Sequence, residues 1–121
     1  MTKYIVVICA SLFTNFSIAG APSIPKQYQG AWAENVASKE NCDSGPESTA
    51  LLISKDQISV GEIGCKVVSV TNEGAGIKVV SKCSIEGEYF DDTVSLNLLG
   101  NKLKANNRNW QKQTLLLSKC K

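Results

Sequence analysis

The sequence Ile24-Pro25-Lys26-Gln27-Tyr28-Gln29-Gly30-Ala31-Trp32-Ala33-Glu34-Asn35 is the stretch around which the rest of the chain is expected to fold. Pro22 and Pro25 restrict the backbone at its start to extended or turn conformations. Gly30 permits a sharp bend or a close backbone approach, and Trp32 then brings a very large apolar side chain. We therefore expect Trp32 to point inward and to anchor the short strands that follow it.

The residues before this stretch have the order of a secretory signal peptide. Residues 1–4 carry one lysine, residues 5–13 are apolar except for one serine, and small residues follow. A charged start, an apolar middle and a small-residue end are the parts of such a signal. Because the apolar run is shorter than the ~20 residues that cross a bilayer, a cleaved signal over 1–19 is preferred to a membrane anchor. Residues 20–121 are then one domain, periplasmic or secreted.

Composition excludes several function classes. The chain has 13 basic and 11 acidic residues, and a balance so close to neutral argues against a nucleic-acid partner. It has no histidine, so the commonest metal ligand and the usual proton shuttle are missing. Neither a glycine-rich phosphate loop nor the spacing of an activated nucleophile is present. We expect no catalytic residue, no metal and no cofactor.

Four cysteines lie beyond the leader, at Cys42, Cys65, Cys83 and Cys120. An even number in a short exported chain indicates two disulfides, and the absence of any Cys-x-x-Cys pair argues against a zinc site. Four cysteines allow three pairings. Cys42–Cys65 with Cys83–Cys120 is preferred, and a cross-strand Cys65–Cys83 bridge is the main alternative, because these two are nearly symmetric about the turn at residues 73–74.

After the leader, short β-like segments alternate with turn residues. Residues 77–85 are the clearest case, with Ile77, Val79, Ser81, Cys83 and Ile85 on one face. No segment shows a helical period of helix length. The expected strands are 31–36, 49–54, 57–60, 65–71, 77–85, 89–98, 102–105 and 110–120. This pattern predicts an all-β fold of about eight short strands, an antiparallel meander that forms a small barrel or a sandwich.

Two stretches carry a resemblance to known proteins. Ile24-Pro25 followed by Gly30-Ala31-Trp32-Ala33, together with the later Cys83-Ser84-Ile85-Glu86-Gly87-Glu88-Tyr89, resembles a group of small, exported, largely uncharacterised bacterial proteins. Their mature chains open with Ile-Pro and Gly-x-Trp-Ala and continue as β-meanders. The resemblance implies a periplasmic, barrel-like domain and adds little about its role.

The Gly-x-Trp pattern is also distantly similar to lipocalins and avidins, in which it plugs one end of a barrel. This likeness implies that Gly30 and Trp32 form such a plug, and that Arg108, the only arginine, covers Trp32 from the last strand. Trp110 is a second candidate anchor, and both tryptophans are expected to be core or plug residues rather than cavity walls. Roughly 100 residues cannot supply eight long strands, so the pattern leaves open whether side chains fill the interior or a ligand can enter it.

Two charged groups are candidate sites. Glu86, Glu88, Asp91 and Asp92 could bind a cation or act as paired carboxylates, but they lack the spacing of a calcium loop, and a solvated face is preferred. The end of the chain is basic and could bind an anionic polymer or an acidic partner, or could face the acidic group across the sheet. Its members are Lys102, Lys104, Arg108, Lys112, Lys119 and Lys121.

Two functions remain, and neither is catalytic. The preferred one is a monomeric protein-interaction module of the bacterial envelope, an inhibitor or immunity-type protein that presents the disulfide-tethered loop 37–48 to a partner protein. The alternative is a lipocalin- or avidin-like barrel that binds a small ligand. An open interior would favour the second function, and contacts through the loop would favour the first.

Overall fold

The structure is a computed structural model that describes residues 22–34, 42, 50–110 and 112–120. A short 3-10 helix, η1 (Lys26–Tyr28), precedes the strands. The strands are β1 (Gly30–Ala33), β2 (Leu51–Ile53), β3 (Gln57–Val60), β4 (Ile63–Glu73), β5 (Gly76–Ile85), β6 (Glu88–Leu99), β7 (Lys102–Asn106) and β8 (Thr114–Lys119). The expected leader 1–19, and the expected loop 37–48 apart from Cys42, lie outside the described residues.

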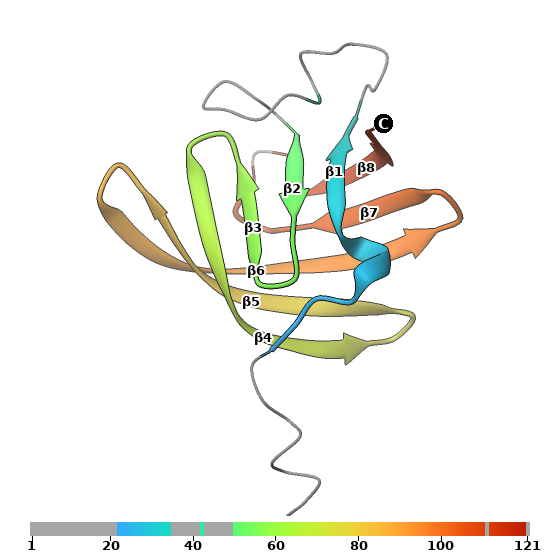
Figure 1. The fold of residues 1–121 in the computed structure, drawn as a ribbon, viewed down its shortest axis with the longest axis horizontal. Coiled ribbons are helices and arrows are strands. Elements are labelled where there is room, and N and C mark those ends of the chain that lie inside the picture. Colours follow the sequence, from blue (N-terminus) through green and yellow to red (C-terminus); the bar gives the residue numbers. More distant parts are fainter. Residues whose placement is uncertain (1–21, 35–41, 43–49, 111, 121) are drawn as a thin grey trace, which may run out of the picture.

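The eight strands form one closed antiparallel barrel (Figure 1). Each strand pairs with its neighbour along the chain, and β8 returns to pair with β1 through Trp32–Lys119 and Ala33–Ser118. The backbone N–H of Cys120 extends this closing ladder by donating to the Ala31 carbonyl at 2.8 Å. The prediction of an all-β antiparallel meander is confirmed, and of the two arrangements expected, the chain adopts the barrel.

The strands differ greatly in length. β4, β5 and β6 have 11, 10 and 12 residues, whereas β1, β2 and β3 have four, three and four. β6 pairs with β5 along almost its whole length, but it pairs with β7 only from Ser95 to Leu99. The β5–β6 hairpin therefore projects beyond β7, as Figure 1 shows on the left. This mismatch opens the wall of the barrel at one place.

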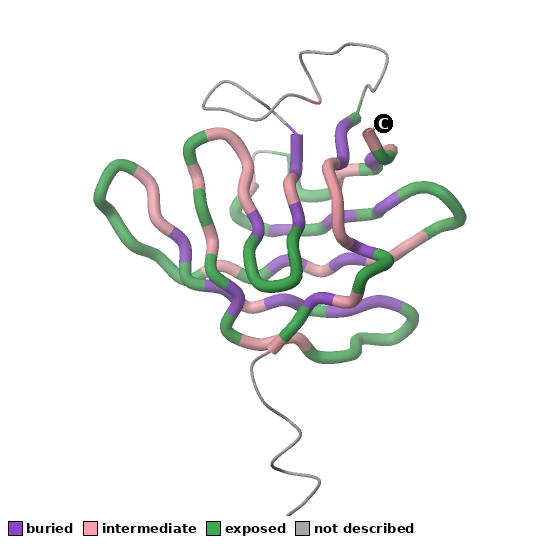
Figure 2. The backbone as a smooth tube through the Cα atoms, viewed as in Figure 1, coloured by how far each residue is buried: buried purple, intermediate pink, exposed green. Residues whose placement is uncertain are grey.

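The inward faces of the strands carry the core. Along β5, Ile77, Val79, Ser81 and Cys83 are buried, while the residues between them are exposed or half-buried (Figure 2). This alternation is the one predicted for residues 77–85, and it follows from the two-residue period of a strand with one buried face. The shorter β7 follows the same rule, since Leu103 and Ala105 are fully buried between exposed neighbours.

β4 departs from regular alternation at a bulge. Its register with β5 shifts between Val67 and Ser69, and the extra residue, Val68, is 46% exposed. Cys65 and Val67 pack toward the core before the bulge, and Val70 does so after it. Because a bulge inserts one residue, the inward-facing positions change from odd to even numbers at this point. Regular alternation over the expected strand 65–71 does not predict this change.

The N-terminal stretch packs against the barrel. Ile24, Tyr28 and Trp32 are all nearly inaccessible to solvent and belong to the main core. The Trp32 indole Nε1–H donates to the Tyr28 carbonyl at 3.0 Å, and the Ile24 N–H donates to the Lys55 carbonyl at 2.8 Å. Gly30 has a φ of 131°, where a side chain would also meet that of Lys119. The hydrogen bond from Trp32 to Tyr28 thus spans the turn that Gly30 allows, and it fixes the indole against the N-terminal stretch.

Two disulfides link Cys42 to Cys120 and Cys65 to Cys83. The preferred pairing, Cys42 with Cys65 and Cys83 with Cys120, is wrong, and the cross-strand alternative is correct. Cys65 and Cys83 are direct partners in the β4–β5 ladder, with Cα atoms 3.9 Å apart. Cys120 lies beside β1 because the barrel closes there, which places it near the segment that follows β1. Chain order could not show this closure.

The last expected strand begins later than predicted. Residues 110–120 were expected to be extended throughout, but β8 starts at Thr114. Before it, Asn107 forms a turn in which its carbonyl accepts the Trp110 N–H at 3.1 Å and its side-chain Oδ1 accepts the Asn109 N–H at 2.9 Å. Asparagine favours such turns because its side chain mimics a backbone group. Trp110 therefore lies in the β7–β8 connection.

The two disulfides indicate an oxidising, extracytoplasmic environment for the folded chain. In the part of the chain that the structure describes, no helix has the length and apolar character needed to cross a membrane.

Candidate functional site

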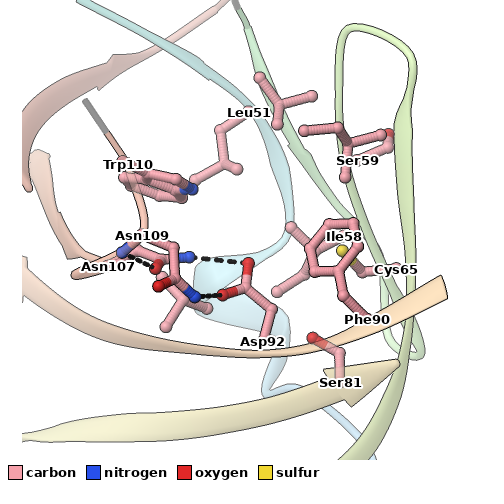
Figure 3. A pocket seen from close by; sticks show the side chains of 13 residues that line it. Leu51, Ile58, Ser59, Cys65, Ser81, Phe90, Asp92, Asn107, Asn109 and Trp110 are labelled. Carbon is pink, nitrogen blue, oxygen red and sulfur yellow. Dashed lines mark hydrogen bonds between the residues drawn. The ribbon is translucent and has the colours of Figure 1, made fainter. Parts of the chain in front are cut away.

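A cavity of about 150 Å³ opens where β6 leaves β7 (Figure 3). Its apolar walls come from strands on both sides of the barrel and include Leu51, Ile58, Val60, Ile63 and Val94. Side chains therefore do not fill the interior completely, which answers a question that the sequence left open. The reason is the unequal strand length described above, since the long β6 and the short β7 cannot close the wall with a backbone ladder over residues 88–94.

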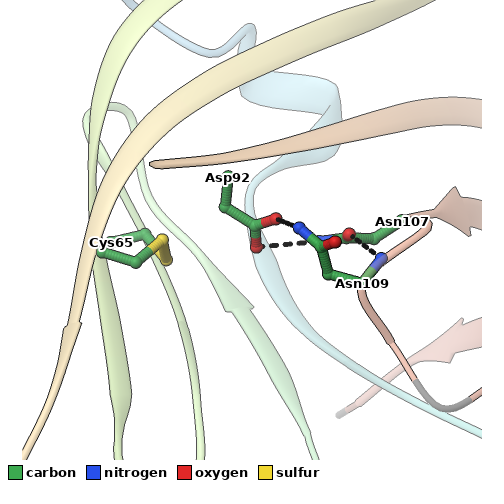
Figure 4. Close-up of a disulfide and its surroundings, with 5 residues drawn as sticks. Cys65, Asp92, Asn107 and Asn109 are labelled. Carbon is green, nitrogen blue, oxygen red and sulfur yellow. Dashed lines mark hydrogen bonds between the residues drawn. A yellow bond between two sulfur atoms is a disulfide. The ribbon is translucent and has the colours of Figure 1, made fainter. Parts of the chain in front are cut away.

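Side chains close this gap instead. The carboxylate of Asp92 on β6 accepts a hydrogen bond on each oxygen, from Asn107 Nδ2 at 2.8 Å and from Asn109 Nδ2 at 3.0 Å. Asp92, Asn107 and Asn109, which we call the Asp92 clasp, thus join β6 to the segment after β7 (Figure 4). Hydrogen bonds to an ionised acceptor are stronger than neutral ones, and the clasp links β6 to the segment after β7 where the backbone ladder is missing.

Asn107 is the centre of the clasp. It is 2% exposed, and besides its bond to Asp92 its backbone N–H donates to the Gln113 carbonyl at 2.8 Å. With the bonds it accepts from Asn109 and Trp110, both its backbone and its side chain are engaged. A buried amide must be satisfied in this way because an unpaired one costs free energy. The position of the clasp is therefore determined by the turn as well as by Asp92.

The Cys65–Cys83 disulfide lies beside the clasp in the cavity wall (Figure 4). The two sulfur atoms and an Asp92 carboxylate oxygen lie within 4.8 Å of one another. Thiolate, rather than disulfide sulfur, is the form of cysteine that binds metals. In the oxidised protein, these three residues are therefore a covalent link next to a carboxylate, and the disulfide supplies an apolar part of the wall.

Two aromatic side chains border the cavity. Trp110 is half-buried and packs against the core, while Phe90 is 36% exposed. In Figure 3 they lie on opposite sides of Asp92. The two tryptophans thus have different positions: Trp32 is buried with the N-terminal stretch, whereas Trp110 is a cavity wall. Trp110 packs against the core, but the turn at Asn107 also directs it to the cavity wall, which was not expected.

The structure does not bring the acidic group together. Glu86 and Glu88 are exposed at the β5–β6 turn, and Asp91 faces outward, 3.6 Å from Lys82 Nζ. Asp92 is the register partner of buried Ser81 and faces inward. Neighbours along a strand point to opposite faces, so the four acids cannot form one site. Glu86, Glu88 and Asp91 lie on a solvated face, whereas Asp92 borders the cavity.

The basic residues are also spread over several surfaces. Lys119 lies over the Trp32 ring, with its Nζ 5.5 Å from the ring centroid. The expectation that Arg108 covers Trp32 is corrected by this contact: Arg108 is exposed and borders a shallow hollow with Asp91 and Asp92. The reason is that Arg108 precedes β8, whereas Lys119 is the register partner of Trp32.

Further lysines interact elsewhere on the surface. Lys102 Nζ donates to Ser118 Oγ at 2.8 Å across β7 and β8, and Lys112 Nζ lies 2.9 Å from Glu34 Oε2. Lys104 is exposed on β7, and Lys121 lies outside the described residues. Exposed ion pairs of this kind contribute little to stability, and they do not gather the positive charge into one patch.

Of the three clasp residues, Asp92 was expected only as one of four acidic residues, and Asn107 and Asn109 were not expected as site residues. A signal for Asp92 was present, because it shares the even-numbered face of β6 with Phe90, Val94 and Leu96. A carboxylate on an otherwise apolar strand face indicates a buried or functional polar site. No comparable signal exists for Asn107 and Asn109, which read as ordinary turn residues. Their approach to Asp92 depends on the relative lengths of β6 and β7.

No family model, curated protein or solved structure matches this chain. The resemblance to small exported bacterial proteins and the distant likeness to lipocalins therefore stay predictions.

Proposed function

We propose that the protein is a non-catalytic binding protein of the periplasm or the secreted fraction, and that it takes a small ligand into the cavity beside the Asp92 clasp. The observation that supports this proposal is the cavity itself. It combines mainly apolar walls with a few polar groups at one side, the usual composition of a small-molecule site. A filled barrel end would have had no such space.

The volume limits the size of the ligand. Drug-sized ligands occupy pockets of roughly 300–1,000 Å³, and this cavity is smaller, at about 150 Å³. An apolar cavity of about this size in another protein holds a molecule such as benzene. We therefore expect a ligand with a single ring or a short branched chain in the apolar part, with its polar end toward the clasp.

Fluorobenzene is a suitable first probe, because its fluorine signal broadens and shifts on binding. The expected result is saturable binding that also moves the Trp110 indole N–H signal in a 1H–15N spectrum. Val60→Phe should abolish this binding by filling the cavity from β3. Val80→Phe is the matched control, since Val80 faces away from the core on β5 and does not border the cavity. Absence of saturable binding by the unaltered protein, both of fluorobenzene and of single-ring probes that carry a polar group, would refute the proposal.

Native mass spectrometry of protein purified from the periplasm adds an independent measurement. Extra mass of a few hundred daltons or less, lost in Val60→Phe and kept in Val80→Phe, would identify the natural ligand in this cavity. A ligand retained by both variants would place it elsewhere on the protein.

A second candidate is the protein-interaction module, of inhibitor or immunity type, expected from the sequence. Tyr89 is 84% exposed next to the projecting β5–β6 turn, and exposed aromatic side chains are common at the centre of interfaces. Cys42 also tethers the segment between β1 and β2 to the end of β8. If Tyr89→Ser lost the capture of a specific envelope protein that Val60→Phe kept, this second function would be favoured over the first.

A further inference from the structure

We infer that the cavity selects small organic ammonium ions, in particular primary amines with a compact apolar body. This inference rests on the proposed function, because it names the chemical class of the ligand for the same cavity. It depends on the charge of Asp92, on the aromatic side chains beside it and on the size of the space.

The charge of Asp92 favours a cationic ligand. Asp92 points toward the cavity, and both of its hydrogen-bond donors are neutral amides. Among the described residues, the salt bridges join Lys82 to Asp91 and Lys112 to Glu34, and Arg108 borders the shallow hollow beside Asp92 without forming a salt bridge to it. A half-buried carboxylate without a cationic partner favours a ligand that brings the positive charge. An anionic ligand would be repelled at the same place.

The two aromatic side chains at the border of the cavity favour the same kind of ligand. Trp110 and Phe90 stand on either side of Asp92 at the border of the cavity (Figure 3). The faces of aromatic rings attract cations, tryptophan most strongly, and aromatic cages are a common way to bind ammonium groups. Because the carboxylate and both rings border the same cavity, an ammonium ion there can be attracted by each of them, whereas a neutral hydroxyl group would gain only a hydrogen bond.

The Asp92 oxygens and the size of the cavity also suit a small primary amine. Each Asp92 oxygen accepts one bond from the clasp, and a carboxylate oxygen can accept about two. A primary ammonium group has three N–H donors, so it can use the remaining capacity without breaking the clasp. The apolar walls from β2, β3 and β6 then leave about 150 Å³ for the rest of the molecule. Benzylamine, one ring with one carbon and one nitrogen, is of suitable size.

Three monosubstituted benzenes of similar size test this inference on the unaltered protein. Benzylamine, benzyl alcohol and benzoate differ in charge at one position, and binding is followed by the Trp110 indole signal. We expect benzylamine to bind at least about tenfold more tightly than benzyl alcohol, and benzoate to bind most weakly. Added salt should reduce the advantage of benzylamine and leave benzyl alcohol unaffected.

Two matched variants locate the effect. Asp92→Asn removes the charge at nearly constant shape and should abolish the preference for the amine, while benzyl alcohol binding stays within about threefold. Asp91→Asn removes the neighbouring charge on the outward face and should leave all three affinities unchanged. The comparison of ligands on the unaltered protein keeps the inference testable even if Asp92→Asn folds poorly.

The outcomes separate the inference from the function on which it rests. If fluorobenzene and all three test compounds fail to bind, the proposed function fails and the inference fails with it. If benzyl alcohol binds as tightly as benzylamine, the cavity is a ligand site but the selection of ammonium is refuted. An amine preference that survives in Asp92→Asn would also refute the inference, because the charge would then come from elsewhere.

Discussion

Replacement of Asn107 by alanine should destabilise the barrel far more than replacement of its neighbour Asn106. Asn107→Ala removes one hydrogen bond to the Asp92 carboxylate, at 2.8 Å, and one from the Asn109 N–H, at 2.9 Å. A bond to a charged group contributes about 1.5–3 kcal/mol and a neutral one about 0.5–1.5 kcal/mol. The expected loss in the free energy of unfolding is therefore about 2–4.5 kcal/mol.

The matched control is Asn106→Ala. Asn106 is the preceding residue and donates one side-chain bond, to Thr114 Oγ1 at 3.0 Å, but that bond is exposed. Since water can replace an exposed bond at little cost, we expect a loss of about 0.5 kcal/mol or less. The two variants share the β7 end and the asparagine-to-alanine change, so the difference between them reports the contribution of the clasp.

Urea unfolding, followed by far-ultraviolet circular dichroism, measures both variants. Circular dichroism is preferred to tryptophan fluorescence because Trp110 lies in the affected turn and its signal would change for local reasons. A difference of less than about 0.5 kcal/mol between the two variants would refute the reasoning, since it would lie within the effect expected of surface changes. It would mean that water satisfies Asp92 once Asn107 is gone, and that the clasp does not hold the barrel closed.

The remaining predictions concern covalent and steric constraints on the barrel. Replacing both Cys42 and Cys120 by alanine should cost about 4.5 kcal/mol, and removing the cross-strand β4–β5 bridge about 3 kcal/mol, because the two bridges close loops of 78 and 18 residues. Urea unfolding of the two double variants checks the order of these losses, and an equal loss in both variants would contradict the loop-length argument. Reduction of both bridges should lower the melting temperature by more than about ten degrees. Gly76→Ala should cost more than about 2 kcal/mol, because its Cβ would run into the Leu96 carbonyl oxygen in the adjacent strand. Gly74→Ala is the control with open space and a φ of 59°, where a loss of about 1–2 kcal/mol reflects backbone conformation alone; an equal or smaller loss in Gly76→Ala would refute the clash.

Local sequence patterns determined most of the strands. The alternation from Ile77 to Ile85 and the β-branched residues before it place β4 and β5 correctly, because a two-residue period with one buried face is a property of the strand itself. Turn residues between the strands then make a meander the simplest connection. The sequence could also indicate that four cysteines form two bridges, since an even count in a small chain is typical of a disulfide-linked domain.

Tertiary structure decided everything that depends on residues distant in sequence. The pairing of Cys42 with Cys120 follows from the closure of β8 on β1, and the contact of Lys119 with Trp32 follows from the register of that same pair. The cavity and its clasp exist because β6 is longer than β7, which leaves Asp92 facing side chains instead of a strand. Such features arise from the lengths and registers of several strands together, and no local pattern contains that information.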